Sequence, residues 1–257
     1  MSDEEIEASK APLLDHLIEL RKRLLWSFAA LAVAFAGCLY FARPILVVLV
    51  APLHFAGQKT LINTEIYGGF FVELKVAFFA ALMVAFPVIA NQLWRFVAPG
   101  LYRRERKALA PFLMATPLLF VAGASLAYFV AIPLALRFLL GFQGDLGGVT
   151  QQALPDVGSY LKFVMQFMFG FGLAFLLPVL LMLLEAAGIV TRKQLVSARR
   201  YAIVGNCAIA AVLTPPDVGS MLLLAVPLVL LYELALLAIW FTERRRARDA
   251  EGEARPA

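Results

Sequence analysis

The chain alternates between long apolar stretches and shorter segments that hold most of its charged residues. Six apolar stretches contain no charged residue or only one. A helix crosses the bilayer core, about 30 Å thick, with about 20 such residues, whereas lipid-facing strands alternate in polarity over about ten. The pattern therefore predicts an all-α integral membrane protein with six transmembrane helices. The predicted spans are Leu24–Phe41, Val76–Leu93, Ala108–Leu136, Phe163–Leu184, Tyr201–Leu213 and Val218–Trp240.

Basic residues are concentrated on one side of these predicted spans. Of the 23 Lys and Arg residues, 18 lie in four alternate segments, and only Arg43, Lys59 and Arg137 lie well inside the segments on the other side. Cytoplasmic loops of membrane proteins carry an excess of Lys and Arg. The distribution therefore predicts that both termini are cytoplasmic, in agreement with an even number of spans. The four basic segments are 1–23, 95–107, 185–200 and 241–257.

The span pattern divides the chain into three regions. We expect residues 1–23 to form a cytoplasmic N-terminal segment, 24–241 a membrane domain, and 242–257 a basic, disordered cytoplasmic tail. Leucines at helical spacing predict an amphipathic helix over residues 12–23. The chain opens with acidic residues, which is not typical of a cleavable signal peptide.

The fifth predicted span is the shortest. Tyr201–Leu213 has 13 residues, which amounts to roughly 20 Å of helix. Thr214–Asp217 leaves no room for a loop before the sixth span. We therefore expect a short helical hairpin whose tip lies below the far membrane surface or thins the bilayer there. The alternative is a helix of ordinary length that begins earlier, within the preceding basic segment.

Other features predict a kinked, cupped bundle. The segment 42–70 is too long for a turn and rich in apolar residues, so short interfacial helices are expected to cover the outer ends of the spans. Proline residues inside the spans predict kinks, which neighbouring helices tolerate by satisfying the freed backbone groups. These prolines are Pro87, Pro117, Pro133, Pro178 and Pro227.

Composition supports the membrane class and narrows the function. Apolar residues make up 62% of the chain and charged residues 16%, against about 45–50% and about 25% in soluble domains. This balance excludes an ordinary soluble fold and an intrinsically disordered chain. The net charge of +5 is explained by membrane topology, so nucleic-acid binding is not predicted. The same basic face can attract anionic lipids.

Candidate catalytic chemistry is absent from the sequence. Cys38 and Cys207 lie in apolar stretches and show neither a disulfide framework nor metal-ligand spacing. His16 and His54 fall on opposite sides of the membrane in the predicted topology. No hydrolase motif, P-loop or intramembrane aspartate pair is present. The sequence therefore predicts no enzyme, no metal site and no cofactor.

Three polar residues lie at membrane depth: Glu233, Asn206 and Gln166. Asn206 and Gln166 are typical of polar contacts between helices. An acid within a span is a candidate functional residue, and for Glu233 the alternative is a hydrogen-bonded acid that joins two helices. One hypothesis is a proton-coupled secondary transporter of a small solute with Glu233 as its site, although the two halves show no internal repeat. Another is a structural scaffold without a ligand.

Four segments carry recognisable motifs: HLIELRKRLL at 16–25, QLWRFVAPGLYRRER at 92–106, SYLKF at 159–163 and LTPPD at 213–217. They resemble the TatC family, the multispanning receptor subunit of the twin-arginine protein translocase, over residues 12–241. The resemblance implies binding of twin-arginine signal peptides of folded precursors and nucleation of an export complex driven by the proton-motive force. It implies small single-span TatA- and TatB-type partners, self-association in a multimeric complex, and location in the bacterial cytoplasmic (inner) membrane.

The resemblance also implies site residues. Glu19 and Glu105 match the carboxylates of the family's cytoplasmic signal-peptide site, and Arg21 and Phe96 match neighbouring positions. Carboxylates suit this ligand because they accept bidentate hydrogen bonds from guanidinium groups. Glu105 lies among basic residues, so an ion pair with a nearby arginine is the alternative for it.

Two further matches concern transport, and one position departs from the family. Pro52 and Asp217 match positions important for transport, and Glu233 is retained as a residue of transport or structural function. The family often carries a glutamate two residues before the proline of its fourth span. Here that position is Leu176, ahead of Pro178, so the polar role of that acid is absent or moved.

Overall fold

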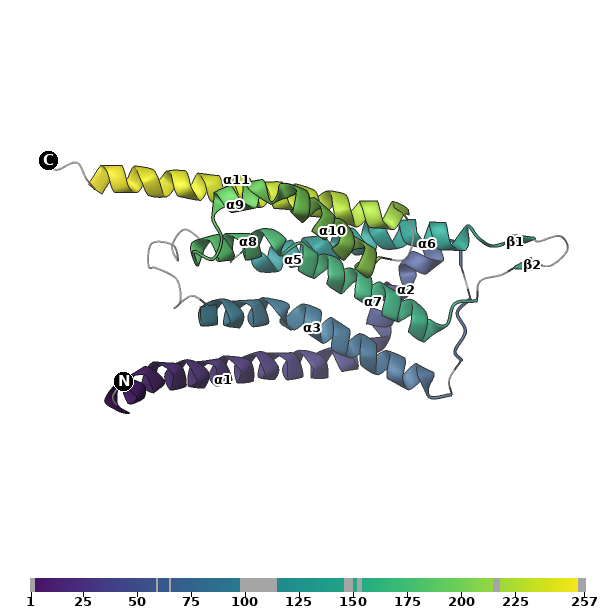
Figure 1. Ribbon diagram of the computed structural model, residues 1–257. Helices are drawn as coiled ribbons and strands as arrows, with labels where there is room; N and C mark the ends of the chain where they lie inside the picture. The colour runs from purple at the N-terminus through teal and green to yellow at the C-terminus, as the bar shows by residue number, and fades with distance from the viewer. Residues whose placement is uncertain are drawn as a thin grey trace.

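A computed structural model describes the backbone of residues 3–58, 60–64, 66–97, 115–145, 150–151, 154–214 and 218–253. Within these ranges the chain is almost wholly helical (Figure 1). The exception is an antiparallel pair of two-residue strands, β1 (Gly144–Asp145) and β2 (Thr150–Gln151). The predicted all-α class is confirmed.

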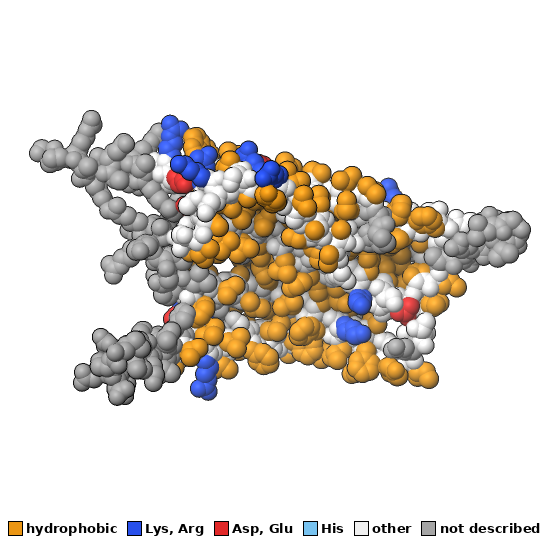
Figure 2. All heavy atoms as spheres, in the orientation of Figure 1, with side chains coloured by type: hydrophobic (Ala, Val, Ile, Leu, Met, Phe, Trp, Pro, Cys, Tyr) orange, Lys and Arg blue, Asp and Glu red, His pale blue; other side chains and the backbone are white. Residues whose placement is uncertain are grey.

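In the part of the chain that the structure describes, five helical segments are long and apolar enough to cross a membrane. They correspond to the first four predicted spans and the last one. Apolar side chains cover most of the molecule's visible face (Figure 2), as a lipid-exposed surface requires. The five segments are Leu17–Tyr40, Gly68–Phe96, Thr116–Leu140, Val157–Ala186 and Val218–Arg244.

The first, second and last of these segments belong to single helices, and the other two are divided. Their helices are α1 (Asp3–Tyr40), α3 (Gly68–Val97), α5 (Thr116–Leu126), a π-helical turn (Ala127–Ala131), α6 (Ile132–Leu140), α7 (Val157–Ala174), α8 (Leu177–Ala186) and α11 (Val218–Glu253).

Prolines coincide with the divisions. Pro133 and Pro178 lie in the first turns of α6 and α8, directly after the π-helical turn and the break between α7 and α8. Proline has no N–H and clashes with the preceding turn, so it is tolerated best where a helix begins. The predicted irregularity is therefore confirmed in these two spans, whereas α3 and α11 continue through Pro87 and Pro227.

The helix α10 (Arg199–Leu213) is short, as predicted. Its 15 residues amount to roughly 22 Å, and α9 (Arg192–Ser197) precedes it as a separate helix with a capping box at Thr191. The alternative of a fifth helix of ordinary length is wrong. The hairpin in which α10 packs on α11 is confirmed. Because α10 is shorter than a full span, the total of six spans stays a prediction.

The outer segment holds a short apolar helix, α2 (Ala42–Phe55). It crosses the bundle from the side of α1 and α3 toward α6 and α7 (Figure 1), and its Leu53 is only 1% exposed. The following loop is tied to the start of α7. There the Ile62 N–H donates to the carbonyl of Pro155 at 3.1 Å, and the Val157 N–H donates to the carbonyl of Ile62 at 3.0 Å.

Two apolar clusters hold the helices together. The larger cluster joins α2, α3, the π-helical turn, α6, α7, α10 and α11, with Phe167 and Phe171 buried in it. The smaller joins α8, α9 and α11, with Trp94 of α3 at its edge. Because lipid tails are as apolar as these side chains, it is their close packing, and not their removal from water, that holds the helices together.

Glycines allow α5 and α7 to approach closely. A Cβ added at Gly123 would lie 2.5 Å from the carbonyl oxygen of Phe171, and one added at Gly172 would lie 2.6 Å from the ring of Phe120. Phe120 in turn stacks on Phe86 of α3, with ring centroids 3.7 Å apart. The contact of α3, α5 and α7 thus depends on two positions without side chains.

The two termini lie at the same end of the bundle (Figure 1). α1 runs unbroken from Asp3 into its span, so the predicted amphipathic segment 12–23 is part of that helix. α11 continues to Glu253, so the backbone is helical through most of the segment expected to be a disordered tail. The reason is its composition, because Glu, Arg and Ala are good helix formers.

Candidate functional site

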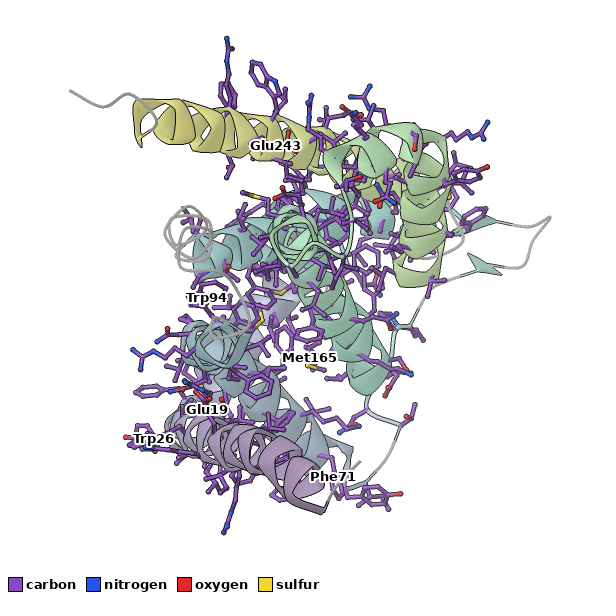
Figure 3. All side chains as sticks on the ribbon, turned by 60° about the vertical axis from the view of Figure 1, so that its left-hand side comes forward. Glu19, Trp26, Phe71, Trp94, Met165 and Glu243 are labelled. Carbon is purple, nitrogen blue, oxygen red and sulfur yellow. The ribbon has the colours of Figure 1, made fainter. Side chains whose placement is uncertain are left out.

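Glu19 lies on the side of α1 nearest to α3 (Figure 3). The partly buried positions of α1 recur at spacings of three and four residues, and Glu19 and Arg23 are the first two described. The same stripe contains Phe35, whose ring meets that of Phe78 on α3 with centroids 6.2 Å apart. The helical period therefore places Glu19 on the packing face of α1. The other members of the stripe are Ser27, Ala30, Leu31, Ala34 and Cys38.

Glu19 forms an ion pair with Arg23, one helical turn later. The Nε of Arg23 donates to Oε1 of Glu19 at 3.0 Å, and the Nη2 of the same guanidinium donates to the same oxygen. Oε2 of Glu19 accepts no hydrogen bond from the described residues. The side chains of Glu19 and Arg23 are 33% and 21% exposed. One oxygen of the carboxylate is thus engaged, and the other has no partner among the described residues.

Arg21 lies on a different face of α1 from Glu19. Arg21 and Lys22 are exposed. Together with Trp26 they line a shallow hollow of about 410 Å³ on the outward side of the helix, where Trp26 is labelled in Figure 3. The structure therefore does not bring Arg21 to the carboxylate of Glu19.

Phe96 lies in the last turn of α3 with a half-buried side chain. It shares that helix with Phe78, and α1 and α3 pack along each other. The nearby Trp94 instead points to the smaller apolar cluster of α8 and α11. Glu105 lies outside the described residues, as does Asp217.

Pro52 lies in α2, at the end of the bundle away from the chain termini, and its side chain is buried. Two tyrosines hold this helix in place. The Tyr128 hydroxyl donates to the carbonyl of Val48 at 2.7 Å, and the Tyr160 hydroxyl donates to the carbonyl of Leu49 at 3.0 Å. Pro52 is therefore part of a helix clamped between the third and fourth spans.

Glu233 pairs with Arg199. The Nη2 of Arg199 donates to Oε2 of Glu233 at 2.9 Å, and the side chains are 41% exposed for Glu233 and 50% for Arg199. Arg199 is the first residue of α10. Glu233 therefore lies beside the start of that helix and is not an unpaired acid within a span. Of the two alternatives, the structure supports the hydrogen-bonded acid that joins two helices. Sequence reasoning missed the partner because 34 positions separate the two residues.

Asn206 and Gln166, the two polar residues expected to form contacts between helices, differ in their burial. Asn206 is 4% exposed, and its Nδ2 has no hydrogen-bond partner in the described part of the chain. Gln166 is exposed and lines a groove of about 740 Å³ near the ends of α6 and α10. Lys162 and Ser159 of α7 add polar groups to its mostly apolar walls. No sequence pattern had indicated this groove.

Asp156 joins the outer loop to α7. As the N-cap of α7 it accepts a hydrogen bond from the Ser159 N–H at 2.9 Å. It also accepts bonds from Oγ1 of Thr64 at 3.0 Å and from the Thr64 N–H at 3.3 Å. The bond from Ser159, followed by those from Thr64, lowers the pKa of this carboxyl below its ordinary value.

A family model for the Sec-independent protein translocase protein (TatC) matches residues 15–227. The chain belongs to the TatC family. It is 45% identical over 246 residues to the TatC of Magnetococcus marinus, covering 95% of this chain and 89% of that protein. It is 41% identical over 227 residues to the TatC of Escherichia coli K12, covering 88% of this chain and 86% of that protein.

Solved structures agree with the family. A crystal structure described as the twin-arginine translocase receptor TatC superposes with a TM-score of 0.73 and 38% identity, covering 89% of this chain and 99% of that one. Family membership confirms the resemblance carried by the four sequence motifs. It identifies the chain as a multispanning subunit of a protein translocase, a transport component and not an enzyme.

Proposed function

We propose that this TatC-family chain is the signal-peptide receptor of a twin-arginine translocase and nucleates its export complex. The observation that carries the proposal is Glu19 at the start of the first span, a partly exposed carboxylate with one oxygen that no described residue contacts. The solved structure that shares this fold is described as a twin-arginine translocase receptor, which supports the same role.

Carboxylates can distinguish arginine from lysine in such a ligand. A guanidinium is planar and donates two parallel hydrogen bonds to a carboxylate, whereas an ammonium is a point charge without that geometry. Each charge-assisted bond contributes about 1.5–3 kcal/mol. In our proposal Glu19 and Glu105 bind the guanidinium groups and Phe96 lies beside them, whereas Arg21, on another face of α1, does not contact the bound guanidinium.

A binding measurement tests the receptor role. Purified full-length protein in detergent is titrated with a fluorescent signal peptide that carries Arg-Arg, and with the same peptide carrying Lys-Lys. We expect the Arg-Arg peptide to bind more tightly and Glu19→Gln to weaken it about tenfold or more, since about 1.4 kcal/mol is tenfold. The matched control is Glu73→Gln, because Glu73 pairs with Arg43 at 3.0 Å on the far end of α3. Equal binding of both peptides, or an unchanged affinity in Glu19→Gln, contradicts the proposal.

We further propose six spans with both termini in the cytoplasm of a bacterial cell, in the inner membrane. The common end of the two termini supports an even number of crossings. The test uses a chain in which Cys38 and Cys207 are replaced by alanine. A single cysteine is then placed at the exposed position 60 or 197, and its labelling shows on which side of the membrane that position lies. An impermeant maleimide should label position 60 in intact cells with a permeabilised outer membrane, and position 197 only after lysis. The opposite pattern reverses the orientation.

The partners in this proposal are single-span TatA- and TatB-type subunits and further copies of the chain, with anionic lipids on the basic side. The short α10 supports a docking place, because a helix shorter than the bilayer favours association with other helices. A photo-crosslinker at Val212, which is 78% exposed, should capture such a subunit. The same probe at Ala225, which is 3% exposed, is the buried control. Capture from position 225 alone contradicts this docking place.

The transporter alternative is not favoured. A proton-coupled site needs an acid whose charge changes during transport, whereas Glu233 is paired with the permanently charged Arg199. Solute uptake into vesicles that depends on Glu233 would be required to revive it.

A further inference from the structure

We infer that Arg23 is an internal competitor for the twin-arginine ligand: its guanidinium occupies Glu19 in the free chain and leaves when a ligand arginine binds. This inference rests on the proposed receptor function. It adds a residue that sets the affinity of the site without belonging to the surface the ligand needs.

The first support is that, among the described residues, only one of three consecutive cations is paired. Arg21, Lys22 and Arg23 follow one another, but the helical period brings only Arg23 onto the stripe that carries Glu19. Arg23 forms the ion pair, while Arg21 and Lys22 are exposed and form no salt bridge with the described residues. The arrangement therefore concerns one position and not the basic segment as a whole.

The second support is the chemistry of the occupied oxygen. Arg23 places Nε and Nη2 on Oε1 of Glu19 and leaves Oε2 without a partner in the described chain. An arriving guanidinium can bind Oε2 first and then take Oε1 as Arg23 withdraws. Arg23 offers Glu19 the same planar donors as the ligand does, so the exchange replaces one guanidinium with another.

The third support is that breaking the ion pair between Glu19 and Arg23 requires little free energy. Ion pairs between adjacent turns of a partly exposed helix are weak, so Arg23 can withdraw without disturbing the fold. Its aliphatic stem can stay on the packing face of α1 while its charged end moves into water.

An internal competitor has a specific signature. It reduces the affinity of every ligand of Glu19 by the same factor, so its removal tightens binding of different ligands alike. We expect Arg23→Gln to tighten the Arg-Arg peptide and the Lys-Lys peptide each by about two- to fivefold. A residue that merely orients Glu19 gives the opposite sign, because its loss weakens binding.

The experiment uses full-length protein in detergent and fluorescence anisotropy with both labelled peptides. The matched control is Lys22→Gln, which removes one positive charge at the next position, on the exposed face. We expect its affinity to stay within about 1.5-fold of the unchanged chain, because exposed charges are screened by salt. Equal tightening in Lys22→Gln and Arg23→Gln overturns the inference in favour of a general charge effect.

A double-mutant cycle completes the test. Arg23 acts through Glu19 in this scheme, so Arg23→Gln should have no effect on binding in a Glu19→Gln chain. Unchanged or weaker binding in Arg23→Gln alone overturns the inference while leaving the receptor role intact. Failure of the unchanged chain to prefer the Arg-Arg peptide overturns the receptor role itself. Elution volume and thermal unfolding of each variant establish that it is folded.

Discussion

The hydroxyl of Tyr128 donates a hydrogen bond to the carbonyl oxygen of Val48 at 2.7 Å. In a regular helix that oxygen accepts from the N–H four residues later. In α2 this position is Pro52, which has no N–H. The π-helical turn Ala127–Ala131 thus supplies a donor from another span to a carbonyl whose ordinary helical donor is missing.

Tyr128 and Pro52 should therefore be energetically coupled. We expect Tyr128→Phe to lower the free energy of unfolding by about 0.5–1.5 kcal/mol, because it removes the hydrogen bond to the Val48 carbonyl. In a Pro52→Ala chain the restored N–H can serve that carbonyl, and Tyr128→Phe should cost less. Denaturant titration of the purified protein in detergent measures both costs.

Tyr160→Phe is the control for this coupling. Tyr160 donates to Leu49, whose carbonyl has the N–H of Leu53 as its ordinary helical partner. The cost of Tyr160→Phe should therefore be the same with Pro52 and with alanine at position 52. An equal cost of Tyr128→Phe in both backgrounds shows that the tyrosine does not replace the missing donor.

Close packing of α5 on α7 predicts sensitivity at its glycines. Gly172→Ala should lower the free energy of unfolding by about 1–3 kcal/mol, because its Cβ overlaps the ring of Phe120. Gly37→Ala is the control, since a Cβ there meets nothing within 4 Å, and it should leave stability unchanged or raise it by about 0.5–1 kcal/mol. Thermal unfolding in detergent compares the two. Equal effects mean that helix propensity and not packing decides.

The pair of Arg199 and Glu233 should stabilise the hairpin of α10 and α11 slightly. Both side chains are more than a third exposed, so a double-mutant cycle with glutamine at each position should give a coupling of about 0.2–1 kcal/mol. Arg200→Gln is the control, because the Arg200 guanidinium lies over the Tyr201 ring at 4.7 Å. Its effect should add to that of Glu233→Gln. Coupling at position 200 as large as at position 199 contradicts the assigned pair.

Acidification should loosen the outer loop only at low pH. Hydrogen bonds lower the pKa of Asp156 in the folded chain, so its contribution is complete above the pKa of the unfolded state, about 3.9. That contribution is lost as the pH falls through the lower folded value. We expect amide-exchange protection of Thr64 and Ser159 to stay constant from about pH 7 to about pH 5 and to fall below about pH 4.

Asp156→Asn tests whether the pH response comes from the charge of this side chain, because it removes the charge and keeps a similar shape. It should reduce protection of the Ser159 amide at every pH and remove the acid-dependent step. Thr64→Val is the companion variant, because it removes one hydroxyl donor and leaves the bond from the Ser159 N–H in place. Its acid-dependent step should persist. An acid-dependent step that survives in Asp156→Asn assigns the pH response to another group.

Much of the fold could be predicted from local sequence. Uncharged stretches such as Val76–Leu93 and Phe163–Leu184 predict helices because transfer into lipid depends on consecutive residues. The short α10 was predictable for the same reason, since Leu213 is followed at once by Thr214 and two prolines. The spacing of Glu19 and Arg23 is also local, and their ion pair could have been expected from the helical period alone.

The candidate site was predictable only in part. Family motifs indicated Glu19 and Phe96, which lie on the adjoining helices α1 and α3. They also grouped Arg21 with Glu19, although side chains two residues apart in a helix point in different directions. The structure places these two side chains on different faces of α1, although they are close together in the sequence motif.

The sequence by itself determined the membrane class, the places of the helices and the short hairpin, because these depend on hydropathy and turn chemistry within a few residues. Only the tertiary structure decided that Glu233 meets Arg199 and that Tyr128 replaces the donor missing at Pro52. Arg199 and Glu233 are 34 positions apart, and Tyr128 and its acceptor Val48 are 80 positions apart. Which helices abut, and at what height, depends on how all the side chains pack together.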